Sequence, residues 1–184
     1  MKFSSGTGFA YVIIVFVLLI LVLGRYIAGG FDFSYFFVGG TDFVDTSKTP
    51  LPVVVQHGQG YDGQFFFRYA LNPFEFSKIA HGVTVDLVPY RMQRIGYPLI
   101  TWIFSFGGQP FLVPFALVLV NMLSFIGIFF FTQKFIQMVK GLPEHIYLPL
   151  FLCGLYMSVA RDLAEVMELF FFWAQCTFIL SRPL

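Results

Sequence analysis

The chain has 184 residues, of which 58% are hydrophobic and only 11% are charged, and its mean hydropathy is +0.79. A soluble domain is usually about half apolar and about a quarter charged, so this balance excludes an ordinary soluble domain and a disordered chain. The formal net charge of +1 provides no basic surface for nucleic acid. We therefore expect an all-α integral membrane protein that forms a single membrane domain over residues 1–184.

The first predicted span covers residues 9–24 and begins with an unbroken apolar run, FAYVIIVFVLLILVL. With its flanking residues, this run approaches the roughly 20 residues that a transmembrane helix needs. A cleaved signal peptide has a similar apolar core, but here the run is long for such a core and Arg25 follows it directly. A retained membrane anchor is therefore the favoured interpretation.

Residues 25–94 differ from the rest of the chain and are predicted to form a long loop outside the hydrocarbon. Acidic and basic residues are spread through this segment, and Gly, Pro, Asn and Asp punctuate it. A structureless loop of this length is uncommon, so we expect short helices at the membrane surface. The best candidates are residues 63–71 and 74–80.

Four more apolar segments are expected, a surface or re-entrant helix followed by three spans, at residues 95–106, 111–133, 146–160 and 163–180. This gives about four transmembrane helices in total. Lys134 and Lys140 follow the 111–133 span and are predicted to be cytoplasmic by the positive-inside rule, as is the N-terminus with Lys2. The 25–94 loop and the turn at 161–162 then share the extracytoplasmic face.

The densest chemical stretch surrounds Asp62. Gly60 and Gly63 flank this residue, so the backbone can turn tightly or approach a ligand closely. If a helix starts here, Asp62 is a natural N-cap, and Gln64 and Arg68 lie one turn apart on one face. One interpretation is a capped interfacial helix whose aromatic residues pack on the membrane. The other is a carboxylate that acts as a general base.

A second cluster contains Arg91 and Arg94, which are three residues apart and would be neighbours on a helix. They are either arginines that snorkel at a membrane interface or a clamp for phosphate oxygens. The residues alone leave these alternatives open.

A third cluster, Arg161, Asp162, Glu165 and Glu168, lies between two apolar runs that leave almost no room for a loop. Charges at the edge of a bilayer are costly and indicate function by default. The alternative is a charged hairpin tip. However, Glu165 and Glu168 lie within the following apolar run, on one face of the expected helix. A charged hairpin tip would not account for charges at these positions.

Cysteine and histidine provide no further site. Cys153 and Cys176 lie inside apolar runs and are interpreted as buried thiols rather than as a disulfide. His57 and His81 do not form a metal-binding motif with Asp62. We therefore expect no metal ligands.

Three ordered motifs carry a resemblance to a known family: YDGQFFFRYALNPF at 61–74, YRMQRIGYPLITW at 90–102 and GLYMSVARDLAE at 154–165. They resemble the N-terminal part of bacterial multi-spanning glycosyltransferases of the GT-C superfamily, mannosyltransferase-like enzymes that use polyprenyl-phosphate sugars. The resemblance covers about residues 9–180. It implies transfer of a sugar from a lipid-phosphate donor at the extracytoplasmic face of the bacterial inner membrane.

The resemblance also implies roles for individual residues. Asp62 would be the catalytic base or would organise the acceptor hydroxyl. The residues implied in substrate binding are Gln64, Arg68, Arg91, Arg94, Arg161, Asp162 and Glu165. A polyprenyl-phosphate sugar is the expected donor, because no nucleotide-binding loop is present. A divalent metal is left open by the resemblance, although no ligand set is visible.

The length is a departure from this superfamily, whose members usually have many more spans. The chain is therefore expected to be an incomplete piece or a shortened descendant. The alternative function is a non-catalytic subunit that packs into a larger membrane complex, with small residues such as Gly127 and Gly154 at close helix contacts. A transporter is less favoured, because few polar residues lie in the spans. Expected partners are membrane lipids, the lipid-linked donor and other membrane subunits.

Overall fold

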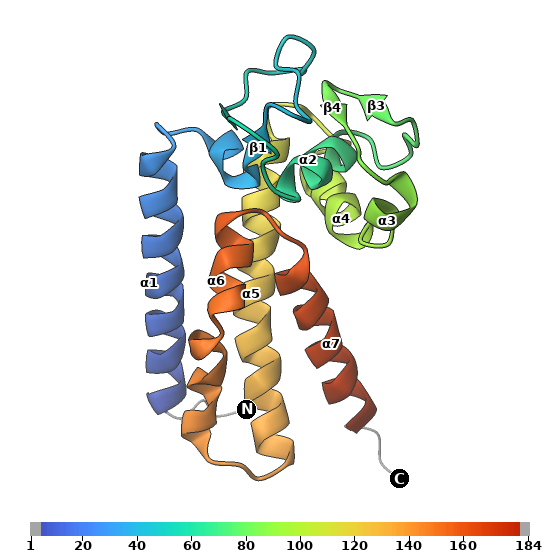
Figure 1. The fold of residues 1–184 in the computed structure, drawn as a ribbon. Helices are drawn as coiled ribbons and strands as arrows, with labels where there is room; N and C mark the ends of the chain where they lie inside the picture. Colours follow the sequence, from blue (N-terminus) through green and yellow to red (C-terminus); the bar gives the residue numbers. More distant parts are fainter. Residues whose placement is uncertain (1–4, 181–184) are drawn as a thin grey trace.

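The computed structural model describes residues 5–180 and is mostly helical, with 62% helix and 5% strand. Three long helices, α1 (Ser5–Ala28), α5 (Val113–Met138) and α7 (Glu165–Leu180), form a bundle with a shorter, broken rod (Figure 1). Within the described residues, two helices are long and apolar enough to cross a membrane, Gly8–Ala28 and Val113–Met138. The mostly helical class is therefore confirmed, and helices of span length occur at two of the four predicted spans, while the four membrane crossings stay predictions.

The broken rod corresponds to the span predicted at 146–160. It consists of a 3-10 helix, η2 (Pro143–Phe151), followed by the eight-residue α6 (Cys153–Ala160). Pro149 lies inside η2 and has no backbone N–H to donate, and Leu152 between the two helices has non-helical angles. The expectation of one continuous helix over this segment is therefore wrong.

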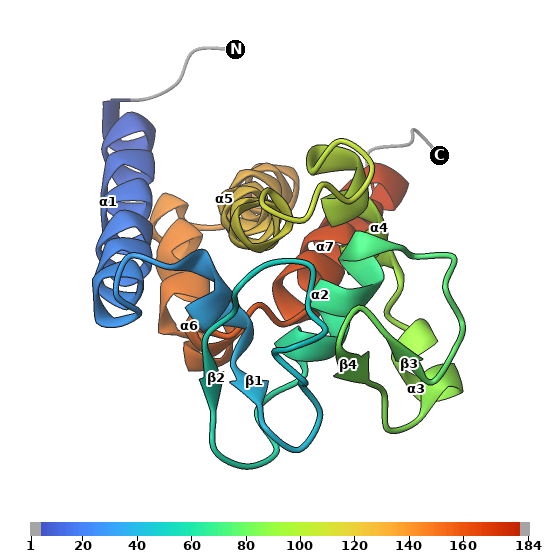
Figure 2. The ribbon, with the colours of Figure 1, turned by 90° about the horizontal axis from the view of Figure 1, so that it is seen from above.

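A cap of short elements covers one end of the bundle (Figure 1). In chain order these are η1 (Phe33–Phe37), β1 (Gly39–Gly40), β2 (Val55–Gln56), α2 (Gly63–Leu71), β3 (Ile79–Ala80), β4 (Val83–Thr84), α3 (Val88–Met92) and α4 (Gly96–Phe104). The strands β1 and β2 pair in parallel, and β3 and β4 form an antiparallel hairpin. Seen from above, α1 stands at the edge of the bundle, apart from α2, α3 and α4 (Figure 2).

Helix α2 coincides with the helix predicted at 63–71, but its surroundings differ from the prediction. Every residue from Gly63 to Leu71 is buried, and the Phe37 and Phe67 rings stack with centroids 4.5 Å apart. The expected packing of these aromatics on a membrane surface is therefore wrong, because they form the core of the cap. The predicted helix at 74–80 is also wrong, since this segment is a turn that leads into β3.

Helix α5 contributes to two apolar clusters, one under the cap and one among the long helices. Its upper residues, such as Val113 and Leu117, pack under the cap with Phe66, whereas Phe125 and Phe129 pack among the long helices. Further along, a Cβ at Gly127 would lie 2.5 Å from the Phe170 ring of α7. This glycine therefore permits the close helix approach expected from the sequence.

The two ends of the bundle carry different segments. The α6–α7 turn lies at the cap end, where a Cβ on Gly63 would be only 2.5 Å from the carbonyl oxygen of Arg161, while the connection between α5 and η2 lies at the opposite end (Figure 1). The region 95–106 is the nine-residue α4 within the cap, which is too short to span a bilayer. The structure thus brings the 25–94 segment and the 161–162 turn together, as the sequence predicts.

Candidate functional site

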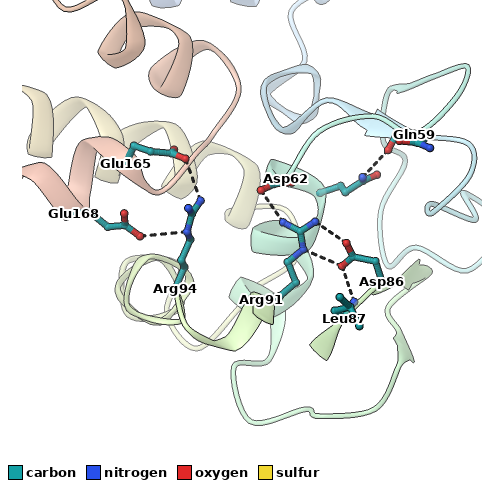
Figure 3. Close-up of polar contacts among 9 residues, drawn as sticks. Gln59, Asp62, Asp86, Leu87, Arg91, Arg94, Glu165 and Glu168 are labelled. Carbon is teal, nitrogen blue, oxygen red and sulfur yellow. Dashed lines mark hydrogen bonds and ion pairs between the residues drawn. The ribbon is translucent and has the colours of Figure 1, made fainter. Parts of the chain in front are cut away.

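Asp62 lies immediately before α2, but it does not cap this helix. Its backbone is helical, with φ −60° and ψ −26°, and its side chain makes no capping hydrogen bond. An N-cap residue needs an extended backbone to turn its oxygen toward the first free N–H groups, so the predicted capping role is wrong. The carboxylate instead forms an ion pair with Arg91, with 2.6 Å between Oδ2 and Nη1 (Figure 3).

The loop before Asp62 packs closely against the backbone of Gly40 at Gly60. Gly60 has a left-handed φ of +67°, and a Cβ at this residue would lie 2.4 Å from the backbone nitrogen of Gly40. A side chain at Gly60 would therefore be strained and would also clash with backbone. The glycine anticipated beside Asp62 is required by this close approach of the chain to itself.

Arg91 is the centre of a three-residue ion-pair group. Its Nε and Nη2 atoms donate to the two carboxylate oxygens of Asp86 at 2.9 and 2.7 Å, while Nη1 faces Asp62 (Figure 3). The guanidinium also lies 4.3 Å from the centroid of the Phe65 ring. Only 11% of the Arg91 side chain is exposed, so two carboxylates and an aromatic face hold it in place.

Asp86 is a residue of this group that the sequence analysis did not select. Its carboxylate also accepts a hydrogen bond from the backbone N–H of Leu87 at 2.7 Å. The Arg91 hydrogen bond is the main cause that holds the pKa of Asp86 below its usual value. Pro89 in the first turn of α3 marks a helix start. An acidic residue directly before a helix start marked by proline was therefore the sequence signal that could have identified Asp86.

Arg94 does not act with Arg91 but pairs with the other side of the site. It follows α3, and its Nη1 atom lies 3.0 Å from Glu165 Oε1 while its Nε atom lies 3.6 Å from Glu168 Oε1 (Figure 3). Glu165 also accepts a hydrogen bond from Ser158 Oγ at 3.2 Å. The two arginines predicted as a pair therefore diverge, and each is matched by two carboxylates.

Gln64 and Arg68 are buried within the cap and stabilise its loops. Gln64 accepts a hydrogen bond from the backbone N–H of Gly40 at 2.9 Å and donates to the carbonyl of Gln59 at 2.8 Å. Arg68 donates to the carbonyl of Ser77 and has no exposed surface. Neither side chain is brought to the Asp62–Arg91 pair, although both were predicted to bind substrate.

The third predicted cluster is divided between surface and interior. The guanidinium carbon of Arg161 lies 4.1 Å from the centroid of the half-exposed Tyr61 ring, next to Asp62 in sequence. Asp162 has no exposed surface at all. Of this cluster, Arg161 and Glu165 therefore lie near the candidate site, whereas Asp162 belongs to the protein interior.

The Glu165 side of the site opens into an apolar groove of about 810 Å³ between the η2–α6 rod and α7. Its walls are mostly apolar and include Leu155, Met157 and Phe172, while Ser158 and the two glutamates paired with Arg94 provide the polar lining. Within residues 5–180, no group of three or more His, Cys, Asp or Glu side chains is arranged to hold a metal ion.

Chemically, this end of the bundle presents a partly exposed carboxylate beside guanidinium groups. The Asp62 side chain is 33% exposed, and its Oδ2 atom lies 2.6 Å from the Arg91 guanidinium. Comparison of the chain with protein-family models, curated proteins and solved structures found no match. The functional argument therefore depends on the geometry of these side chains.

Proposed function

We propose that this chain is a membrane glycosyltransferase-like protein that transfers a sugar from a lipid-phosphate donor to an acceptor hydroxyl. The observation that carries the proposal is the partly exposed Asp62 carboxylate, 2.6 Å from Arg91, at one end of a bundle with two span-length helices. In this proposal the cap faces the outside of a bacterial inner membrane.

Asp62 acts as the general base in the proposed reaction. It accepts the proton of the acceptor hydroxyl while the acceptor oxygen forms a bond to the anomeric carbon of the sugar. The bond between that carbon and the phosphate oxygen breaks, and the lipid phosphate leaves with the electron pair. Arg91, held by Asp86, orients Asp62 and does not itself contact the donor.

Arg94 is the guanidinium that can meet the leaving phosphate. It is 33% exposed, compared with 11% for Arg91, and its contact with Glu168 is long at 3.6 Å. Exchanging this weak contact for a phosphate oxygen requires only a side-chain movement. The adjacent groove beside Glu165 is mostly apolar, as a lipid chain requires.

The test is sugar transfer by the purified chain in lipid nanodiscs supplied with a polyprenyl-phosphate sugar. Asp62→Asn removes the base while keeping the shape of the side chain, so transfer should fall by a factor of about 100 or more. Asp42→Asn, which changes an exposed carboxylate of the same cap, is the matched control and should retain transfer. Equal rates for both variants, or no transfer by the unaltered chain, would contradict the proposal.

A second candidate function is a non-catalytic subunit of a larger membrane complex. It is favoured by the exposed apolar surface of α7, where 57% of Phe172 and 66% of Ile179 are accessible. A photo-crosslinking residue at position 172 would then capture one defined membrane protein in stoichiometric yield. The unaltered chain would show no transfer in the same experiment.

A further inference from the structure

The turn between α6 and α7 contains a carboxyl group with no visible partner. Asp162 is completely buried, and neither of its carboxylate oxygens has a hydrogen-bond partner. Its backbone is also in the left-handed region, with φ 48°. An ionised carboxylate in such a place loses its hydration without compensation.

The charged and titratable groups around Asp162 do not neutralise it directly. Arg25 of α1 and Tyr97 of α4 interact with it electrostatically, and Arg161 and Glu165 are close to it in the sequence. Within residues 5–180, no ion pair joins Arg25 or Arg161 to Asp162. Burial raises the pKa of Asp162 well above its ordinary value, and the positive charge of Arg25 and the Asn121 side chain oppose this rise without cancelling it.

Arg25 is instead directed to η1. Its Nη2 atom donates to the carbonyl of Tyr35 at 3.0 Å, and its guanidinium carbon lies 4.3 Å from the centroid of the Tyr35 ring. Its remaining Nε atom is buried without a partner. The charge therefore acts on Asp162 through space rather than through a hydrogen bond.

Asn121 of α5 is the polar side chain that interacts with the Asp162 carboxyl. Its Nδ2 atom donates to the Tyr97 hydroxyl at 2.8 Å, and this hydroxyl donates to the carbonyl of Leu117 at 2.9 Å. The Asn121 Oδ1 atom is buried and has no partner. Buried acceptor atoms without a partner thus remain on both Asn121 and Asp162.

We propose that Asp162 is a proton-binding site: the carboxyl is protonated in the folded protein and donates a hydrogen bond to Asn121 Oδ1. One proton satisfies an acceptor on each residue and removes the buried charge. The bond ties the α6–α7 turn to α5 and thereby fixes Arg161 beside the cap. This role is independent of the proposed glycosyl transfer, and it makes Asp162 a structural residue rather than a substrate ligand.

Infrared spectroscopy of the whole chain in nanodiscs tests the protonation directly. At pH 7 the unaltered chain should show the C=O stretching band of a protonated carboxyl, and Asp162→Asn should lack it. Asp45→Asn is the control, since the pKa of Asp45 is about 2 and this carboxylate is ionised at pH 7, so the band should persist. Absence of the band from the unaltered chain would overturn the proposal, as would its persistence in Asp162→Asn.

The pH dependence of thermal stability provides an independent measurement. The folded chain would hold a proton that the unfolded chain loses above the ordinary carboxyl pKa of 3.8, so stability should fall as pH rises. The melting temperature of the unaltered chain, relative to Asp162→Asn, should fall by about 4 °C per pH unit above that value. A difference that is flat or rises with pH would indicate an ionised Asp162 and refute the proposal.

Discussion

Gly63 is the point at which the cap, the Asp62 loop and the α6–α7 turn meet, so its substitution by alanine tests the packing of the whole end. A Cβ at this position would lie 2.5 Å from the Arg161 carbonyl oxygen and 2.7 Å from the Phe37 carbonyl oxygen. Both neighbours are backbone atoms and cannot rotate away. Gly63→Ala should therefore push the turn and η1 away from α2.

The expected cost follows from these distances. Overpacking a well-packed interior typically costs 1–3 kcal/mol of stability. Because a Cβ at Gly63 would clash with fixed backbone on two sides, we expect Gly63→Ala to cost about 3 kcal/mol from overpacking. Replacing Gly by Ala in a helix contributes about 1 kcal/mol in the opposite direction. The net loss is about 2 kcal/mol, which corresponds to a fall of roughly 4 to 8 °C in melting temperature for a chain of this size.

Thermal unfolding in nanodiscs, followed by intrinsic fluorescence, measures this change. Gly154→Ala is the matched control, because Gly154 lies in the first turn of α6 and a Cβ there would meet nothing within 4 Å. This control should keep or raise the melting temperature. Equal melting temperatures for the two variants would refute the argument that the α6–α7 turn rests directly on Gly63.

Two further predictions concern charge and orientation. Arg91→Gln should lower stability at pH 7 by about 1 kcal/mol, after allowance for solvent screening of the partly exposed carboxylates. Because Arg91 lowers the pKa of Asp86, the difference in unfolding free energy between the variant and the unaltered chain should shrink as pH falls below 3.8. Unfolding measured over a range of pH tests this, and a difference that stays constant would contradict it. For orientation, Ser47→Cys and Gly141→Cys are compared in a background without the native cysteines. An impermeant thiol reagent added outside intact cells should label position 47 and not 141, and labelling of 141 would reverse the proposed topology.

Much of the fold was accessible to sequence reasoning where periodicity and composition act locally. The helix over residues 63–71 has the expected bounds, and the 25–94 segment meets the 161–162 turn as predicted. The burial of α2 was not predictable in the same way. A short phenylalanine-rich helix has the same sequence pattern whether it packs against lipid or against protein. Here η1 and α4 provide the protein contacts.

The site was partly predictable from residue types and less so from their pairing. Asp62 and Arg91 were both selected, but their ion pair joins residues 29 positions apart (91 − 62) and depends on how α3 folds back. Asp86 was missed because its role comes from a bidentate contact made across the start of α3. Spacing along the chain also paired Arg91 with Arg94, whereas the chain turns after Met92 and sends them to different carboxylates.

The transfer rate at saturating lipid-linked donor tests most directly whether Asp62 is the base of the proposed sugar transfer. With donor saturating, differences in donor binding no longer affect the rate. Asp62→Asn should then transfer at least about 100-fold more slowly than the unaltered chain, while its affinity for the donor stays the same. A variant that transfers at the unaltered rate would contradict the claim.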